Sequence, residues 1–329
     1  MQLPLLSRRR FAALSLLALA RPGAALSAEP VPPFDAWLKD LRRDALAQGV
    51  RAGTLERALA GVEPIPRVIE LDRRQPEGRL TFAEYRERVV TRGRVERGRE
   101  LLRANAPLLR RVEERYGVPA RVIVALWGME SNFGERQGSF SVVASLATLA
   151  FEGRRAAFFR KELISALKIL DAGDVSPSAM LGSWAGAMGQ CQFMPSTYLG
   201  YAVDGDGDGR RDIWRTRADV FASAANYLAN AGWNPGLRWG RPVRAPGDLA
   251  RERGGLDHRA ALARWKADGV RLPDGGELPA APVEASLLTM DEAGPSYLVY
   301  PNFRTIMVWN RSTYFALSVG LLSDLIETG

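Results

Sequence analysis

Residues 118–134 of the chain read VPARVIVALWGMESNFG, in which eight apolar or small residues run directly into a carboxylic acid, Glu130. Pro119 suits the first turn of a helix. The spacing predicts that this helix has a buried stripe made up of Ile123, Leu126 and Trp127. A polar and flexible turn, Ser-Asn-Phe-Gly, follows at once. Glu130 is therefore predicted to close the helix and to face a desolvated cleft.

The position of Glu130 suggests a chemical role. Burial disfavours a carboxylate and raises the pKa of the acid. Cleavage of a glycosidic bond needs an acid that is still protonated near neutral pH, because the leaving oxygen departs easily only when it receives a proton. The alternative is a helix-end glutamate that has only a local hydrogen-bond partner.

Length and composition limit the class of protein. The chain has 329 residues, 47% of them hydrophobic, which is enough for two or three compact units. Cys191 is the only cysteine and His258 the only histidine, which excludes intrachain disulfides and zinc sites of the Cys/His type and argues against a histidine-assisted nucleophile. Cys191 is expected to be a small packed residue.

The N-terminus has the pattern of an export signal. Three arginines at 8–10 precede an apolar run at 12–20, and small residues follow up to Ala28. This pattern indicates a twin-arginine-type signal peptide at 1–28, with a retained N-terminal anchor as the alternative. No cysteine lies in the signal, so the protein is expected not to be a lipoprotein. We expect a periplasmic location.

The charge balance is mildly basic. The formal net charge is +8, and without the four arginines of the predicted signal the remaining 41 basic and 37 acidic residues leave +4. This excess favours an anionic polymer such as a cell wall, but no dense basic and aromatic cluster indicates nucleic acid.

The N-terminal part of the chain is predicted to be helical up to residue 116. Two short helices are expected between Phe34 and Ala60, an extended surface segment at 62–78, a helix starting at Thr81, and one long charged helix at about 95–116. Helices joined by Gly-rich loops are expected at 118–239. A small region with short strands is expected at 242–301, before a final helix at 312–326.

A second stretch of chemical interest, residues 182–198, reads GSWAGAMGQCQFMPSTY. Its small residues allow close approach to the backbone, while Ser183, Gln190 and Gln192 offer neutral hydrogen bonds of the kind that bind sugars. A Gly-rich loop before a helix that starts at a proline is the alternative. Most tryptophans of the 118–239 segment are expected to be packing residues, and Trp184 is the strongest candidate for stacking on a sugar.

Three motifs together resemble the B family of lytic murein transglycosylases. They are GMESNFG at 128–134, GAMGQCQFMP at 186–195 and Ala-Asn-Tyr at 225–227, and NFRTI at 302–306 and NRST at 310–313 also match. The resemblance implies a lysozyme-like core with Glu130 as the single catalytic acid. It also implies that Ser183 orients this acid and that sugar subsites are lined by Gln192, Tyr227 and Asn310. Trp309 and Phe315 depart from the pattern, since aromatic hydroxyls often stand at those positions.

An acidic loop forms the third candidate site. Acids at 204, 206, 208 and 212, glycine at 209 and a free carbonyl at Arg210 fit an EF-hand calcium loop. Position 12 of the loop is Arg215, where a glutamate is expected. The resembled family closes its loop with a later acid, for which Asp219 is the candidate. Ca²⁺ is thus expected as a structural ion bound by Asp204, Asp206, Asp208, Arg210 and Asp219, and a solvated Asp/Gly turn is the alternative.

The predicted fold class is α+β and mainly helical. We expect a signal peptide at 1–28, an N-terminal helical domain at 29–116, a lysozyme-like catalytic core with the acidic loop at 117–240, a small β-containing domain that returns to the active site at 241–311, and a C-terminal helix at 312–329 that packs with the N-terminal domain.

The predicted function is that of a peptidoglycan lytic transglycosylase, which forms 1,6-anhydromuramic acid ends and needs no cofactor for its chemistry. A hydrolytic muramidase and a non-catalytic wall-binding scaffold are the alternatives. The expected partners are glycan strands and complexes of cell-wall synthesis or turnover, and the enzyme is expected to be a monomer. Glu135 is the nearest second acid.

Overall fold

The computed structural model describes residues 33–74, 80–152, 154–291 and 294–327. Those from Phe34 onward belong to one compact unit, Phe34–Gly329. The predicted signal peptide at 1–28 lies outside the described residues. Within the described ranges, no helix is both long and apolar enough to cross a membrane.

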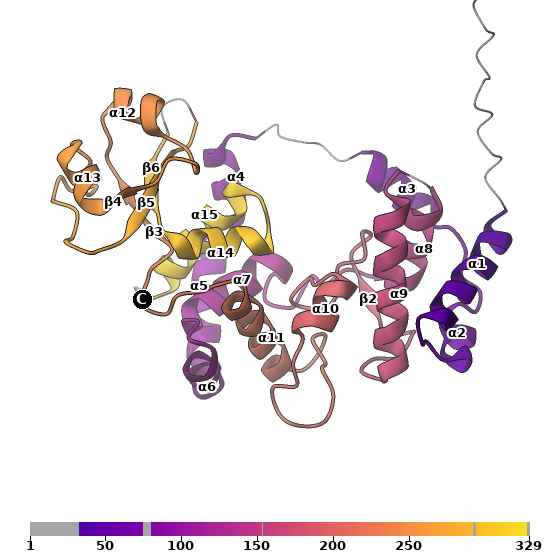
Figure 1. The fold of residues 1–329 in the computed structure, drawn as a ribbon. Coiled ribbons are helices and arrows are strands. Elements are labelled where there is room, and N and C mark those ends of the chain that lie inside the picture. Colours follow the sequence, from indigo (N-terminus) through magenta and orange to yellow (C-terminus); the bar gives the residue numbers. More distant parts are fainter. Residues whose placement is uncertain (1–32, 75–79, 153, 292–293, 328–329) are drawn as a thin grey trace, which may run out of the picture. The chain divides into compact units, whose positions relative to one another are not determined.

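The fold is mainly helical, as predicted (Figure 1). The helices of the described part are α1 (Phe34–Ala47), α2 (Ala52–Ala58), α3 (Pro66–Arg73), α4 (Phe82–Val89), α5 (Arg92–Ala104), α6 (Ala106–Tyr116), α7 (Ala120–Ser131), α8 (Val142–Glu152), α9 (Ala156–Ala172), α10 (Pro195–Tyr201), α11 (Arg217–Asn230), α12 (Gly247–Arg253), α13 (Leu262–Ala267), α14 (Pro301–Trp309) and α15 (Thr313–Glu327).

Two small antiparallel sheets accompany the helices. Strands β1 (Phe140–Ser141) and β2 (Leu181–Gly182) pair with each other. The second sheet has the order β3-β6-β5-β4. Its strands are β3 (Gly240–Val243), β4 (Ala260–Ala261), β5 (Glu284–Thr289) and β6 (Ser296–Val299).

The four-stranded sheet has its own hydrophobic core. Helices α12 and α13 lie beside it (Figure 1), and its central residue is Trp265, which is fully buried and donates from its indole nitrogen to the carbonyl of Ala285 at 3.0 Å. A separate and larger core joins the remaining helices. The predicted β-containing insertion before the C-terminal helix is therefore confirmed.

The predicted extended segment at 62–78 is wrong in its middle part, where α3 forms. Pro66 occupies the first turn of this helix, where its missing N–H costs nothing, and Val68 is fully buried. Asp72 is also buried and forms ion pairs with Arg154 and Arg155. Packing on α8 and these ion pairs stabilise a helix that the scattered prolines and charges concealed.

The predicted long helix at 95–116 is two helices, α5 and α6. The break lies at Asn105, whose side-chain amide donates to the carbonyl of Leu101 at 2.7 Å and so competes with the helical ladder. Pro107 stands in the first turn of α6 and cannot donate to the preceding turn.

Helix α7 lies inside the larger core and carries the catalytic candidate. It packs on α5, α6, α11 and α15, and its residues 122–128 are all buried. Burial on every side explains why its apolar run is nearly continuous rather than striped. The C-terminal helix α15 packs on α4, α5 and α7, and so supports the helix that ends near Glu130.

The turn after α7 is strained. Asn132 and Phe133 both have positive φ, at 51° and 61°, a conformation that costs free energy for residues other than glycine. The Phe133 ring packs edge-on against Trp127 and lies directly over Gly128, where an added Cβ would be 2.7 Å from the ring. The position of the Phe133 ring therefore requires glycine at position 128, and this packing holds the end of α7 in one position.

Candidate active site around Glu130

Glu130 lies in the last turn of α7 and meets the end of α14. Its Oε1 accepts a 2.7 Å hydrogen bond from the indole Nε1 of Trp309. Beside this contact is a small apolar cavity, which is lined by Ile123, Leu126, Trp127, Glu130, Gln190, Cys191, Val220, Phe221, Ala224 and Trp309.

The surroundings of Glu130 tune its proton affinity. Burial against the apolar walls raises the pKa of Glu130 to about 7, and the hydrogen bond from Trp309 acts in the opposite direction, because it stabilises the charged form. A carboxyl group with a pKa near 7 can both donate and accept a proton at neutral pH.

An aromatic wall extends from Trp309. Its indole lies 5.1 Å from the ring of Phe193 and 4.8 Å from that of Tyr227, centroid to centroid. A hollow of about 80 Å³ opens beside these rings, and Gln192 and Thr197 also line it. The combination of aromatic faces with amide and hydroxyl groups is suited to sugar rings.

Tyr227 and Gln192 both line this hollow, and their predicted contact with sugar stays a prediction. The Tyr227 hydroxyl donates to the carbonyl of Val308 at 3.0 Å. The Gln192 amide nitrogen donates to the carbonyls of Gly189, at 2.8 Å, and Gln137, at 3.1 Å. Gln192 has a positive φ of 51°, a second strained position at the site.

Ser183 and Gln190 support the Gly-rich loop. The Ser183 hydroxyl accepts from the backbone N–H of Ala187 at 3.0 Å, and its predicted contact with Glu130 is not among the hydrogen bonds of the described residues. Gln190 is buried, accepts from the indole of Trp127 at 2.8 Å and donates to the carbonyl of Trp214 at 2.8 Å. Its amide joins α7 to the loop before α11, and its predicted contact with substrate stays a prediction.

The remaining candidates lie further out. Trp184 is half-buried and packs against the larger core. Asn310 is exposed, and its side-chain oxygen accepts from the N–H of Ser312 at 3.0 Å in the turn between α14 and α15. Glu135 is exposed and accepts from the Asn132 amide at 2.5 Å, outside the two cavities that border Trp309.

Sequence reasoning missed the role of Trp309 as a polar partner of the acid. The sequence showed an aromatic residue without a hydroxyl and so indicated stacking alone. The indole N–H, however, is a hydrogen-bond donor. Among the described side chains, it makes the only hydrogen bond to Glu130. The sequence would have indicated this hydrogen bond if the indole N–H of Trp309 had been counted as a donor.

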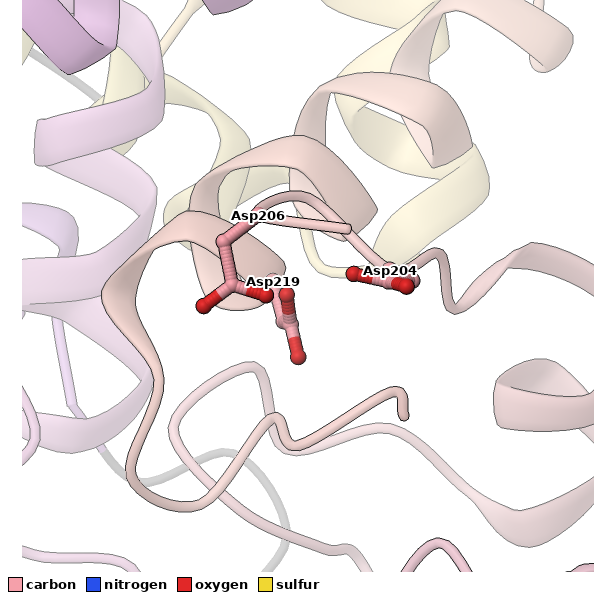
Figure 2. A group of neighbouring side chains, drawn as sticks. All are labelled: Asp204, Asp206 and Asp219. Carbon is pink, nitrogen blue, oxygen red and sulfur yellow. The ribbon is translucent and has the colours of Figure 1, made fainter. Parts of the chain in front are cut away.

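Three carboxylates converge at the acidic loop. Oxygen atoms of Asp204, Asp206 and Asp219 lie within 4.8 Å of one another, and Figure 2 shows the three side chains directed at a common space. Asp219 is fully buried and accepts from the N–H groups of Gly205, at 2.7 Å, and Asp212, at 2.6 Å. Burial raises the pKa of Asp219 to about 6, and the charges of Asp206 and Asp204 contribute.

This donor set fits a hard divalent cation. Carboxylate oxygens are the ligands that Ca²⁺ prefers, and a cation would relieve the repulsion from Asp206 and Asp204, which adds to the effect of burial on the pKa of Asp219. Asp208 lies outside the group of three, and its carboxylate accepts from the N–H of Arg210 at 2.8 Å. Three of the ligands predicted from the sequence, Asp204, Asp206 and Asp219, thus converge. The other two, Asp208 and Arg210, are exposed and lie outside this group.

The family described as the transglycosylase SLT domain matches residues 33–324. The chain belongs to this family. Membrane-bound lytic murein transglycosylase B of Escherichia coli (strain K12), a curated relative, is 34% identical over 251 residues, which is 74% of this chain and 67% of the relative.

The structure of this chain is also similar to solved structures of lytic transglycosylases. SltB3 from Pseudomonas aeruginosa, in complex with NAG-anhNAM-pentapeptide, is 47% identical with a TM-score of 0.87, covering 90% of this chain and 80% of that one. The Escherichia coli lytic transglycosylase Slt35, in complex with calcium, is 30% identical with a TM-score of 0.77, covering 88% of this chain and 92% of that one. The predicted lysozyme-like core and the enzyme class, lytic murein transglycosylase, are confirmed.

Proposed function

We propose that this enzyme cleaves the β-1,4 bond between N-acetylmuramic acid and N-acetylglucosamine in peptidoglycan, with Glu130 as the single acid and base and 1,6-anhydromuramic acid ends as products. The observation that carries the proposal is the Glu130 carboxyl group, which is set among apolar side chains with a pKa of about 7 beside an aromatic hollow.

The mechanism uses one carboxyl group twice. Protonated Glu130 gives its proton to the leaving glucosamine oxygen as the glycosidic bond breaks. The muramic acid 6-hydroxyl then attacks the anomeric carbon of its own ring and gives its proton to the Glu130 carboxylate. The acid is thereby regenerated and no water is consumed. The indole N–H of Trp309 stabilises the carboxylate between the two steps.

A single carboxylate favours the intramolecular route. Hydrolysis by retaining or inverting glycosidases needs a second carboxylate as nucleophile or base. Among the described residues that line the two cavities beside Trp309, Glu130 is the one carboxylic acid. The 6-hydroxyl, held in the same molecule, has an advantage of several kcal/mol over free water. SltB3, a similar protein, was solved with an anhydro-sugar ligand, which supports this route.

Mass analysis of the products tests the proposal. Digestion of purified sacculi should release fragments with anhydromuramic ends, which are lighter by one water than hydrolysed fragments. Reducing muramic acid ends would instead identify a muramidase. Binding of sacculi without any release would identify a wall-binding scaffold.

We also propose that the acidic loop holds structural Ca²⁺. Asp204, Asp206 and Asp219 would supply the converging carboxylates, and Asp208 and the Arg210 carbonyl would complete the set. The cation would neutralise this charge and fix the loop that leads into α11, and it takes no part in bond cleavage. That Slt35 was solved in complex with calcium supports the assignment.

The proposed location rests on the sequence. We propose that a signal at 1–28 exports the enzyme to the periplasm, where its glycan substrate lies, and that it works there as a monomer that cell-wall complexes can recruit. Sequencing of the N-terminus of periplasmic protein tests the first part, with Glu29 as the expected first residue.

A further inference from the structure

Gln190 of the Gly-rich loop is held by three hydrogen bonds that join it to two other segments. Its backbone N–H donates to the carbonyl of Ile213 at 2.9 Å, and its side-chain nitrogen donates to the carbonyl of Trp214 at 2.8 Å. Its side-chain oxygen accepts from the indole of Trp127 at 2.8 Å. Because both ends of its amide are engaged in this way, Gln190 keeps a fixed orientation.

The Gln190 amide contacts the chain on both sides of Glu130. Trp127 precedes Glu130 by three residues on α7, and Gly134 follows it by four residues in the turn. Gly134 has a φ of 88°, and a Cβ added there would collide with the side-chain oxygen of Gln190, so the amide packs closely on this turn. One neutral side chain thus touches the segments that precede and follow the acid.

Trp127 forms part of the apolar wall beside Glu130. Both residues line the same small cavity, together with Gln190. The indole is almost fully buried and packs edge-on against Phe133 and Phe221. Among the described residues, Gln190 is the acceptor of its N–H, and a buried donor without an acceptor is destabilising. The amide therefore determines where the indole is stable.

Gln190 is turned away from the aromatic hollow beside Trp309. It is buried and does not line that hollow, and its amide nitrogen and oxygen are directed at Trp214 and Trp127. This orientation does not favour the contact with a sugar that the sequence predicted. An effect of Gln190 on catalysis is therefore exerted through Trp127 and the turn after α7.

The titratable and charged groups around this wall come from α4, the Gly-rich loop and α11. Among the described residues, Tyr85 of α4 and Cys191 are the groups whose pKa the charge of Glu130 affects. Burial raises the pKa of both, so both are neutral near pH 7. The guanidinium of Arg217, at the start of α11, carries a positive charge and lies 5.8 Å from the centre of the Trp127 ring. Of these groups, only Glu130 changes its charge near pH 7.

We propose that Gln190 is a positioning residue for the proton transfer, which fixes the indole of Trp127 as a dry wall against Glu130. The inference rests on the proposed role of Glu130 and adds a residue that does not touch the substrate. Without the amide, the indole N–H and the Trp214 carbonyl lose their partners, so the ring moves or water enters the cavity. Either change exposes the carboxyl group to solvent and reverses part of the burial that raises the pKa of Glu130 to about 7.

The test is the pH profile of kcat/KM for Gln190→Met, which keeps the volume of the side chain and removes both side-chain hydrogen bonds. The alkaline limb should move to lower pH by about half a unit or more, because a less buried carboxyl group loses its proton at lower pH. At pH 8 this shift lowers kcat/KM about threefold or more, since on the limb the rate follows the protonated fraction. The loss should fall on kcat, with KM within about twofold of the wild-type value.

Trp127→Phe breaks the same hydrogen bond from the donor side, and it decides the question if Gln190→Met does not fold. Its alkaline limb should also move to lower pH, and the double variant should move no further than the larger single shift, because the same contact is lost in each case. The matched control is Thr148→Val. Thr148 is a buried residue of α8 that accepts from the N–H of Ile65 at 2.9 Å and lies outside the cavities beside Trp309, so this variant should lower the melting temperature and leave the limb in place.

An alkaline limb that does not move in a folded Gln190→Met or Trp127→Phe variant would overturn the inference, and so would single shifts that add in full in the double variant. A raised KM with an unmoved limb in Gln190→Met would overturn it in favour of a contact with substrate. Wild-type enzyme without an alkaline limb, or more than a tenth of wild-type turnover in Glu130→Gln, would instead refute the proposed role of Glu130 itself.

Discussion

The indole Nε1 of Trp309 donates a 2.7 Å hydrogen bond to Oε1 of Glu130, across 179 residues of sequence. This contact joins the ends of α14 and α7, and it exerts one of two opposed effects on the pKa of Glu130. Burial favours the protonated form, and the indole N–H favours the carboxylate. The balance leaves a group that can exchange its proton at neutral pH.

Replacing Trp309 by phenylalanine tests this balance. The ring remains, but the donor is lost, so the carboxylate is less stabilised and the pKa of Glu130 should rise above about 7. A hydrogen bond to a charged group is worth about 1.5–3 kcal/mol, so the pKa of Glu130 is expected to rise by about one to two units. Because the first step needs protonated Glu130, activity falls as the pH rises through this pKa. The alkaline limb of the kcat/KM profile should therefore move to higher pH.

Trp37→Phe serves as the control for that experiment. Trp37 is a partly buried tryptophan of α1 that stacks on Phe34. Its loss should leave the alkaline limb where it is in the wild type. An alkaline limb that stayed in place or moved to lower pH in Trp309→Phe would show that the indole does not stabilise the carboxylate.

Local sequence signals predicted several elements well. Thr81 was expected to start a helix, and in the structure its hydroxyl accepts from the N–H of Glu84 while the Glu84 carboxylate accepts from the N–H of Thr81. A capping box of this kind is made by residues three apart, so the sequence contains all of it. The unusual placement of Glu130 after an apolar run was likewise visible, since that run is itself the buried helix.

Contacts between distant residues were not predictable in the same way. Helix α3 was missed because the partners of Asp72, Arg154 and Arg155, lie about 80 residues further on. The bond from Trp309 to Glu130 depends on the fold bringing α14 back to α7. Sequence patterns show which residues carry chemistry, but the tertiary arrangement decides which atoms they meet.

Glu130→Gln should abolish lysis. The amide fills the same space but cannot donate the proton, and general acid catalysis is worth roughly 10²–10⁴-fold. Turnover of purified sacculi measures the loss. Glu135→Gln is the matched control, since Glu135 is exposed and lies outside the cavities beside Trp309. More than a tenth of wild-type turnover in Glu130→Gln would mean that another residue supplies the proton.

The same substitution should stabilise the protein at alkaline pH. The pKa of Glu130 is about 7 in the folded state against an ordinary glutamate value of 4.5, so the folded state binds the proton more tightly. Stability from this group is complete below about pH 4.5 and is lost as the pH rises through 7. Glu130→Gln does not titrate, so its melting temperature should match that of the wild type at pH 4 and exceed it at pH 8. The difference between 4.5 and about 7 corresponds to about 3 kcal/mol in the free energy of unfolding at pH 8. A gap of equal size at both pH values would contradict this origin.

Calcium should raise the melting temperature through the acidic loop. A ligand that binds only the folded state stabilises it by about 2.7 kcal/mol at one hundred times its Kd. Asp204→Ala removes one of the three converging carboxylates and should remove the gain, whereas Asp274→Ala, in an exposed turn of the small β-containing region, should keep it. The loop lies outside the cavities beside Trp309, so the loss should appear in thermal unfolding without removal of any catalytic group. Melting curves that coincide in millimolar calcium and in chelator would show that the loop is a solvated turn, with Asp219 kept partly protonated by burial instead of by a cation.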